Sequence, residues 1–130
     1  INILLVEDNL VNQLVAKELL LSMQAKVTIA DNGQRALDIL SDNNFDVVLM
    51  DIQMPVMDGL TAATTIRKQE QVSSPQQALP IIAMTAHARE EDKQRSLAVG
   101  MNLHIAKPVT GEVLRESILQ VTAMNKAESN

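Results

Sequence analysis

Three acidic residues stand directly after short apolar segments of the kind that form buried strands. Glu7 and Asp8 follow the run at residues 3–6, and Asp51 follows the run at residues 46–50. If the two strands are parallel neighbours, the three carboxylates meet at one edge of the sheet. Like charges so close cannot all stay ionised without a compensating cation, and a divalent metal bound by oxygen atoms is the simplest candidate. The spacing therefore predicts a site for Mg²⁺, with Mn²⁺ as an acceptable substitute.

Two further polar residues are expected at the same edge. Thr85 follows the apolar run at residues 81–84, and Lys107 comes just after the run at residues 103–105. A metal, an ammonium group and a hydroxyl can together stabilise charge on a phosphoryl group during transfer. Asp51 is the preferred nucleophile because it stands alone at its strand end, and carboxylates do form aspartyl phosphates. The first turn is acidic and lacks a glycine-rich loop, which argues against a nucleotide site there.

The composition places these residues in one small domain. The chain has 130 residues, 46% of them apolar, and its single aromatic residue is Phe45. The net charge of −5 disfavours direct contact with nucleic acid or with an anionic membrane surface. The absence of cysteine excludes disulfides and thiolate metal sites. No apolar run approaches the length of a membrane span, and because the chain starts inside a strand pattern we expect a segment of a longer protein.

Short apolar runs alternate with helical patterns five times along the chain. The predicted strands span residues 2–6, 26–30, 46–50, 80–84 and 103–105. The predicted helices span residues 11–23, 34–41, 60–69, 90–99 and 111–124. Such alternation is typical of an α/β domain in which helices cover both faces of a parallel sheet. We expect one three-layer domain over residues 1–124, with an irregular loop at 69–78 and a polar tail or linker at 125–130.

Five short motifs match one protein family. They occupy residues 6–9, 50–55, 57–59, 84–86 and 106–108. In order and spacing, over nearly the whole chain, they resemble the receiver domains of two-component response regulators. The resemblance implies a flavodoxin-like fold with a five-stranded parallel sheet in the order 2-1-3-4-5. It also implies a phosphorelay domain that takes a phosphoryl group from phosphohistidine with Mg²⁺ and then switches a protein-interaction surface.

The same resemblance implies a role for each residue at the strand ends. Asp51 corresponds to the phosphoacceptor aspartate. Glu7 and Asp8 correspond to the metal-binding acids, and Asp51 and the backbone carbonyl of Gln53 would complete the protein ligands. Lys107 corresponds to the lysine that binds the phosphoryl group.

Switch and tuning residues follow from the resemblance as well. Thr85 corresponds to the hydroxyl switch residue. His104 stands where many receivers carry Tyr or Phe, which puts the strength of threonine–aromatic coupling in question, although histidine there is familiar in hybrid kinases. Leu103 replaces an expected acidic residue and should alter only surface charge. Gln53 and His87 flank the phosphoryl site and are expected to set the lifetime of the phosphoaspartate through water access.

The motif variants point to a subtype. Receivers fused to hybrid sensor histidine kinases are similar at residues 6–9, 11–13, 53–59, 84–88 and 100–102. The implied partners are the phosphohistidine domain of a histidine kinase and a histidine phosphotransfer domain, and a weak homodimer is compatible with the family. The implied setting is bacterial and cytoplasmic, with a parent protein that is compatible with an anchor in the inner membrane. The domain would catalyse its own phosphorylation and dephosphorylation without being a turnover enzyme.

Other interpretations stay open. A stand-alone or output-linked regulator of transcription would carry the same motifs, and kinase modules encoded upstream of Ile1 would decide against it. A Mg²⁺-dependent phosphohydrolase would need a cap region and a second acid two residues after Asp51, where the chain has Gln53. A phosphorylation-dead receiver used only for docking would not need the full set of polar residues.

Each polar residue also has an ordinary structural role open to it. Glu7 and Asp8 would favour the N-terminus of the first helix even without a metal. Thr85 would serve as a helix N-cap, and Lys107 as a solvated surface lysine. Neither His87 nor His104 has a second His or Cys at helical spacing, so neither is expected to bind metal.

Overall fold

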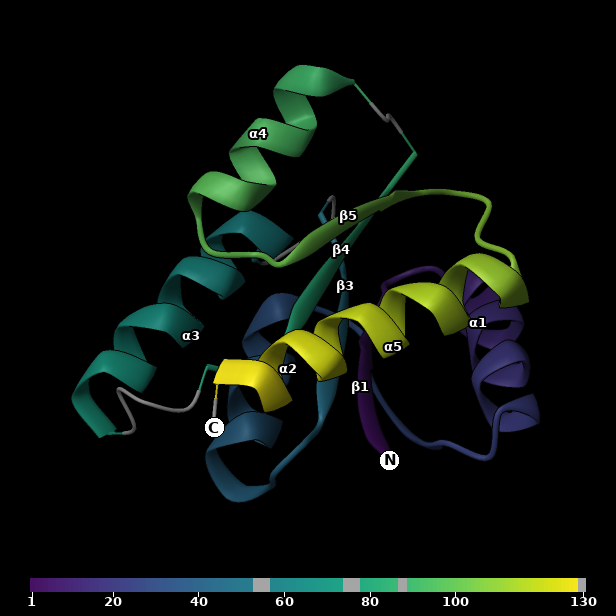
Figure 1. The fold of residues 1–130 in the computed structure, drawn as a ribbon, viewed down its shortest axis with the longest axis horizontal. Helices are drawn as coiled ribbons and strands as arrows, with labels where there is room; N and C mark the ends of the chain where they lie inside the picture. Colours follow the sequence, from purple (N-terminus) through teal and green to yellow (C-terminus); the bar gives the residue numbers. More distant parts are fainter. Residues whose placement is uncertain (53–56, 74–77, 87–88, 129–130) are drawn as a thin grey trace.

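The computed structural model describes residues 1–52, 57–73, 78–86 and 89–128. The strands are β1 (Asn2–Val6), β2 (Lys26–Ala30), β3 (Val47–Asp51), β4 (Ile81–Thr85) and β5 (Leu103–Ala106). The helices are α1 (Leu10–Ser22), α2 (Gly33–Asp42), α3 (Gly59–Ser73), α4 (Glu90–Ala98) and α5 (Gly111–Glu128). The strands form one parallel sheet in the order β2-β1-β3-β4-β5 (Figure 1), which confirms the fold expected from the resemblance.

The sheet is covered on both faces, as the composition of its strands requires. β3 is buried along its whole length, and β1 is buried after its first residue. Because side chains alternate across a strand, Ile3 and Leu5 pack on one face while Leu4 and Val6 pack on the other. The first face contacts buried residues of α1 and α5, and the second contacts those of α2 and α3 (Figure 1). Strands that are apolar on both faces belong in the middle of a parallel sheet, where β1 and β3 lie.

Two helices extend four residues beyond their predicted C-terminal ends. α3 continues to Ser73, into the stretch expected to be a loop from residue 69. α5 continues past residue 124 to Glu128, so the expected polar tail begins as helix. Polar residues of good helix propensity make up much of both extensions, and a search for apolar periodicity overlooks them.

Within the described ranges, no helix combines the length and the apolar composition needed to cross a membrane.

The start of α3 lies against the end of β3. Gly59 begins α3, and a Cβ atom at this position would collide with the Asp51 carbonyl oxygen. The Gly59 amide donates to the Ile52 carbonyl oxygen at 2.9 Å. Asp58 caps α3 by accepting a hydrogen bond from the Thr61 amide at 2.8 Å. The glycine therefore lets α3 start hard against the strand end that carries Asp51.

Candidate functional site

Three carboxylates gather at the carboxyl edge of the sheet. Oxygen atoms of Glu7, Asp8 and Asp51 all lie within 4.8 Å of one another. Glu7 and Asp51 are buried, whereas Asp8 is exposed. The register explains the meeting, because Val6 of β1 pairs with Met50 of β3 and so aligns the residues that follow. The structure thus brings together the acids that the strand pattern places at one edge.

Lys107 puts a positive charge among these acids. Its Nζ atom lies 2.9 Å from Oε2 and 3.2 Å from Oε1 of Glu7, and 3.1 Å from Oδ2 of Asp51. The Lys107 backbone amide donates to the Thr85 carbonyl oxygen at 2.7 Å, which holds the residue after β5 against the end of β4. The Lys107–Pro108 peptide bond is cis. The charge balance that the sequence assigned to a metal is therefore met in part by an ammonium group.

The charges at this edge remain unbalanced. Burial and the Glu7 carboxylate raise the pKa of Asp51 from 3.8 to about 6, and Lys107 opposes that rise. Burial lowers the pKa of Lys107, but its hydrogen bonds to Glu7 and Asp51 outweigh this effect, so that pKa lies above its ordinary value. With every group ionised, the acids exceed the lysine by two negative charges. A divalent cation with oxygen ligands would balance them, so the residues present fit Mg²⁺ or Mn²⁺.

Metal binding at this cluster is expected to weaken as the pH falls through 6. Below that value the Asp51 carboxylate holds a proton, and proton and metal compete for the same oxygen atoms. The affinity for Mg²⁺ should then approach a loss of about tenfold for each pH unit. Calorimetric titration between about pH 7.5 and about pH 4.5 measures this slope. Equal affinities at the two ends would contradict the raised pKa, and Asp51→Asn should flatten the profile.

The two expected switch residues lie on neighbouring strands. Thr85 is buried at the end of β4, directly after Met84, which pairs with Asp51 of β3. His104 pairs with Ala83 across β5 and β4. Among the described side chains, His104 carries a buried Nε2 atom without a hydrogen-bond partner, and burial lowers the pKa of its ring. This environment favours a packed, neutral imidazole over a passive surface role.

Two residues expected to tune the site, Gln53 and His87, lie outside the described residues, and so does the Gln53 carbonyl expected as a metal ligand.

Asn12 and Gln13 were expected only to mark the subtype, yet both contact the site. The Asn12 side-chain amide donates to Glu7 Oε1 at 2.8 Å, and the Gln13 side-chain amide donates to the Glu7 carbonyl oxygen at 2.6 Å. Their place in the first helical turn could have predicted these contacts, because side chains there point back toward the preceding strand end.

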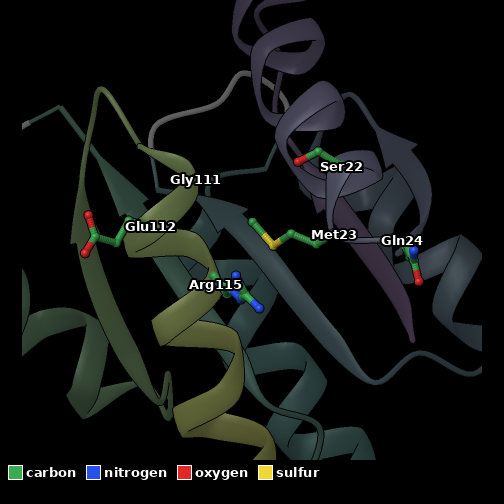
Figure 2. Close-up of a pocket in the computed structure, with 6 residues that line it drawn as sticks. All are labelled: Ser22, Met23, Gln24, Gly111, Glu112 and Arg115. Atoms are coloured by element: carbon green, nitrogen blue, oxygen red, sulfur yellow. The ribbon is translucent and has the colours of Figure 1, made fainter.

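A separate hollow of about 600 Å³ opens between the end of α1 and the start of α5 (Figure 2). Its lining residues are Ser22, Met23, Gln24, Gly111, Glu112 and Arg115. Met23 reaches across the opening, whereas Glu112 points away from it (Figure 2). The charged groups do not converge on this hollow, so the acidic edge of the sheet is the candidate site.

Sequence comparison finds relatives among histidine kinases. The family model for the response regulator receiver domain matches residues 3–119. Histidine kinase 5 of Arabidopsis thaliana is 38% identical over 140 residues, which cover 91% of this chain and 15% of the relative. Sensor histidine kinase GacS of Pseudomonas protegens is 40% identical over 124 residues, which cover 94% of this chain and 13% of the relative. The chain therefore spans only a small part of the length of these relatives.

Structural comparison finds the same fold in solved receiver domains. The receiver domain of sensor histidine kinase PA1611 from Pseudomonas aeruginosa has a TM-score of 0.83 and 38% identity, with 94% of this chain and 97% of that chain covered. That crystal structure has a magnesium ion coordinated in the active-site cleft. A second match is a chain in the co-crystal structure of the Saccharomyces cerevisiae histidine phosphotransfer protein Ypd1 with the receiver domain of Ssk1. Its TM-score is 0.86 and its identity is 32%, with 95% of this chain and 90% of that chain covered.

Proposed function

The chain belongs to the response regulator receiver domain family, and from that premise we propose that Asp51 accepts a phosphoryl group from a phosphohistidine on a partner protein. The chain is a receiver domain of two-component systems, homologous to those of hybrid histidine kinases. The observation that supports the proposal is the setting of Asp51, a buried carboxylate beside two further acids and Lys107. A nucleophile, oxygen ligands for a metal and a cation for phosphoryl oxygens share one strand edge.

The proposed transfer uses these groups in order. A carboxylate oxygen of Asp51 attacks phosphorus, a P–O bond forms, the P–N bond to the donor histidine breaks, and the imidazole leaves with that electron pair. A metal ion held by Glu7, Asp8 and Asp51, when bound, supplies positive charge for the phosphoryl oxygens. Lys107 lowers the pKa of Asp51 against the effect of burial, which keeps the nucleophile ionised at neutral pH. Burial of Asp51 also limits access of water to the phosphorylated product.

Phosphorylation would then be sensed by residues around β5. The new group adds about −1.5 to −2 charge if it resembles other phosphorylated side chains. Lys107 can exchange its contacts with Glu7 for a phosphoryl oxygen, and the Thr85 hydroxyl can donate to another. Both residues border β5, because Lys107 follows it directly and Thr85 of β4 pairs with Ala106, its last residue. The surface formed by α4, β5 and α5, with His104 beneath α4, is therefore the proposed two-state element.

A docking surface for the phosphohistidine partner lies beside the acids. The first half of α1 exposes Leu10 at 78%, Val11 at 68%, Leu14 at 59% and Val15 at 47%. Large apolar side chains gathered on one exposed helix are typical of a protein interface. We propose that a histidine phosphotransfer domain covers this α1 patch. The complex of Ypd1 with the receiver domain of Ssk1 supports that class of partner.

Leu14→Asp is expected to slow transfer from a phosphorylated histidine phosphotransfer domain by about tenfold or more, because it places a charge in the apolar patch. Leu119→Asp on α5 is the matched control, since Leu119 is 61% exposed. Phosphorylation by acetyl phosphate needs no docking surface and should be unchanged in both variants. Rapid-quench kinetics measures the rates. An unchanged rate in Leu14→Asp would remove α1 from the interface, and a wild-type chain that accepts phosphate from neither donor would refute the proposed function.

The parent protein is proposed to be a hybrid sensor histidine kinase. In that setting the domain takes phosphate from the kinase's own histidine and hands it to a histidine phosphotransfer domain, in the cytoplasm and without contacting membrane or nucleic acid itself. The relatives in Arabidopsis thaliana and Pseudomonas protegens support a hybrid kinase over a stand-alone regulator. The expected bacterial source stays a prediction, because those relatives include a plant protein. The coding sequence upstream of Ile1 tests the parent assignment directly.

A further inference from the structure

We propose that Asn12 is a positioning residue that holds the Glu7 carboxylate in its metal-binding place while Lys107 changes partners. Asn12 Nδ2 donates to Glu7 Oε1 at 2.8 Å. Lys107 Nζ contacts both oxygens of the same carboxylate. The inference rests on the proposed function, in which Lys107 leaves Glu7 for a phosphoryl oxygen.

Glu7 needs a second partner because its residue is only 1% exposed. A buried carboxylate that loses its hydrogen bonds either rotates away or takes up a proton, and both outcomes remove it as a metal ligand. When Lys107 moves to a phosphoryl oxygen, both of its hydrogen bonds to Glu7 are lost. The hydrogen bond from the Asn12 side-chain amide does not involve Lys107, so it remains. An amide is neutral, so it fixes the carboxylate without cancelling the charge that attracts a cation.

The first turn of α1 is built to keep Asn12 in place. The Asn12 backbone amide donates to Oδ1 of Asn9, the N-cap of the helix, at 3.0 Å. The next residue, Gln13, joins the helix to the strand end, since its side-chain amide donates to the Glu7 carbonyl oxygen at 2.6 Å. The Gln13 backbone amide also donates to the Asn9 carbonyl oxygen at 2.9 Å. These bonds fix the backbone of the first turn against the end of β1 without a metal, and the Asn12 side chain extends from that turn to Glu7. A fixed support of this kind is the condition for orienting a metal ligand.

Asn12→Ala tests this role through Mg²⁺ affinity. Loss of a group that orients a metal ligand typically weakens metal binding by about tenfold or more, so we expect a rise of about tenfold in Kd. Asn44→Ala, a matched change at an exposed position between α2 and β3, should leave Kd unchanged. Alanine is a better helix former than asparagine, so helix loss would not explain the effect. Calorimetric titration measures Kd, with unfolding of the metal-free variants as the check on folding, and equal Kd values for Asn12→Ala and wild type would overturn the proposal.

A second measurement separates positioning from the transfer chemistry. With acetyl phosphate as donor, Asn12→Ala should be phosphorylated slowly at low Mg²⁺ and at the wild-type rate once Mg²⁺ is saturating. A rate that stays low at saturating Mg²⁺ would overturn the positioning role. If the wild-type chain accepted no phosphate while Asn12→Ala still bound Mg²⁺ more weakly, the proposed function would fail and the positioning of Glu7 by Asn12 would stand.

Discussion

Lys107→Met is expected to lower the free energy of unfolding of the metal-free protein by about 3 kcal/mol. The Lys107 ammonium contacts two carboxylates, Glu7 and Asp51, whose side chains are 2% and 6% exposed. Removing it leaves two buried like charges without their cation. The loss of stability stays at the lower end of the range for broken buried ion pairs, because Asp51 can take up a proton. Denaturant unfolding in the presence of EDTA at neutral pH measures the change.

Mg²⁺ should restore part of that loss, because a cation that binds only the folded state stabilises it. Lys17→Met, at an exposed position of α1, is the control and should change stability by no more than about 0.5 kcal/mol. Equal effects of Lys17→Met and Lys107→Met would show that the ion pairs at the strand edge carry no stability.

Asp51→Asn, at the other end of the same ion pair, is expected to act in the opposite direction and raise metal-free stability at neutral pH. Burial and Glu7 raise the pKa of Asp51 from 3.8 to about 6, so folding disfavours its ionised form. A neutral amide removes that penalty, which is on the order of 3 kcal/mol with the opposing effect of Lys107 already included. The sign follows from linkage. The penalty is present above about pH 6 and is relieved as the pH falls from 6 toward 3.8, where the wild-type carboxyl protonates in the folded state.

Unfolding in EDTA at about pH 7.5 and about pH 5 checks both the sign and the window, and the gain should shrink at the lower pH. Asp42→Asn is a matched control at an exposed position near the end of α2 and should show no such dependence. A loss of stability in Asp51→Asn at neutral pH would mean that Asp51 is held by its partners more strongly than it is repelled.

The strands could be predicted because burial on both faces leaves a direct trace in the sequence. The runs that became β1 and β3 are apolar at nearly every position, which a two-sided parallel sheet requires. Their adjacency could not be read from the runs themselves, since an apolar strand fits beside any other, and it came from the family resemblance. The extensions of α3 to Ser73 and of α5 to Glu128 escaped for the opposite reason, because polar helix formers carry no periodic signal.

The site divides along a similar line. Glu7, Asp8 and Asp51 could be predicted to meet because they are attached to strand ends, whose positions follow from the sheet. The contacts of Lys107 with the acids could not, because a long flexible side chain can reach a metal, a phosphoryl group or a carboxylate from the same backbone position. The contact from Asn12 to Glu7 depends on how the first turn of α1 faces the end of β1, which is a matter of tertiary geometry.

The identity of the phosphoacceptor is the central claim, and mass spectrometry tests it most directly. The chain is incubated with Mg²⁺ and acetyl phosphate, its intact mass is recorded before and after treatment with base, and the modified peptide is sequenced. The prediction is a gain of one phosphoryl group that is base-labile, maps to Asp51, and is absent in Asp51→Asn and in EDTA. No gain in the wild-type chain, or an undiminished gain in Asp51→Asn, would contradict the assignment.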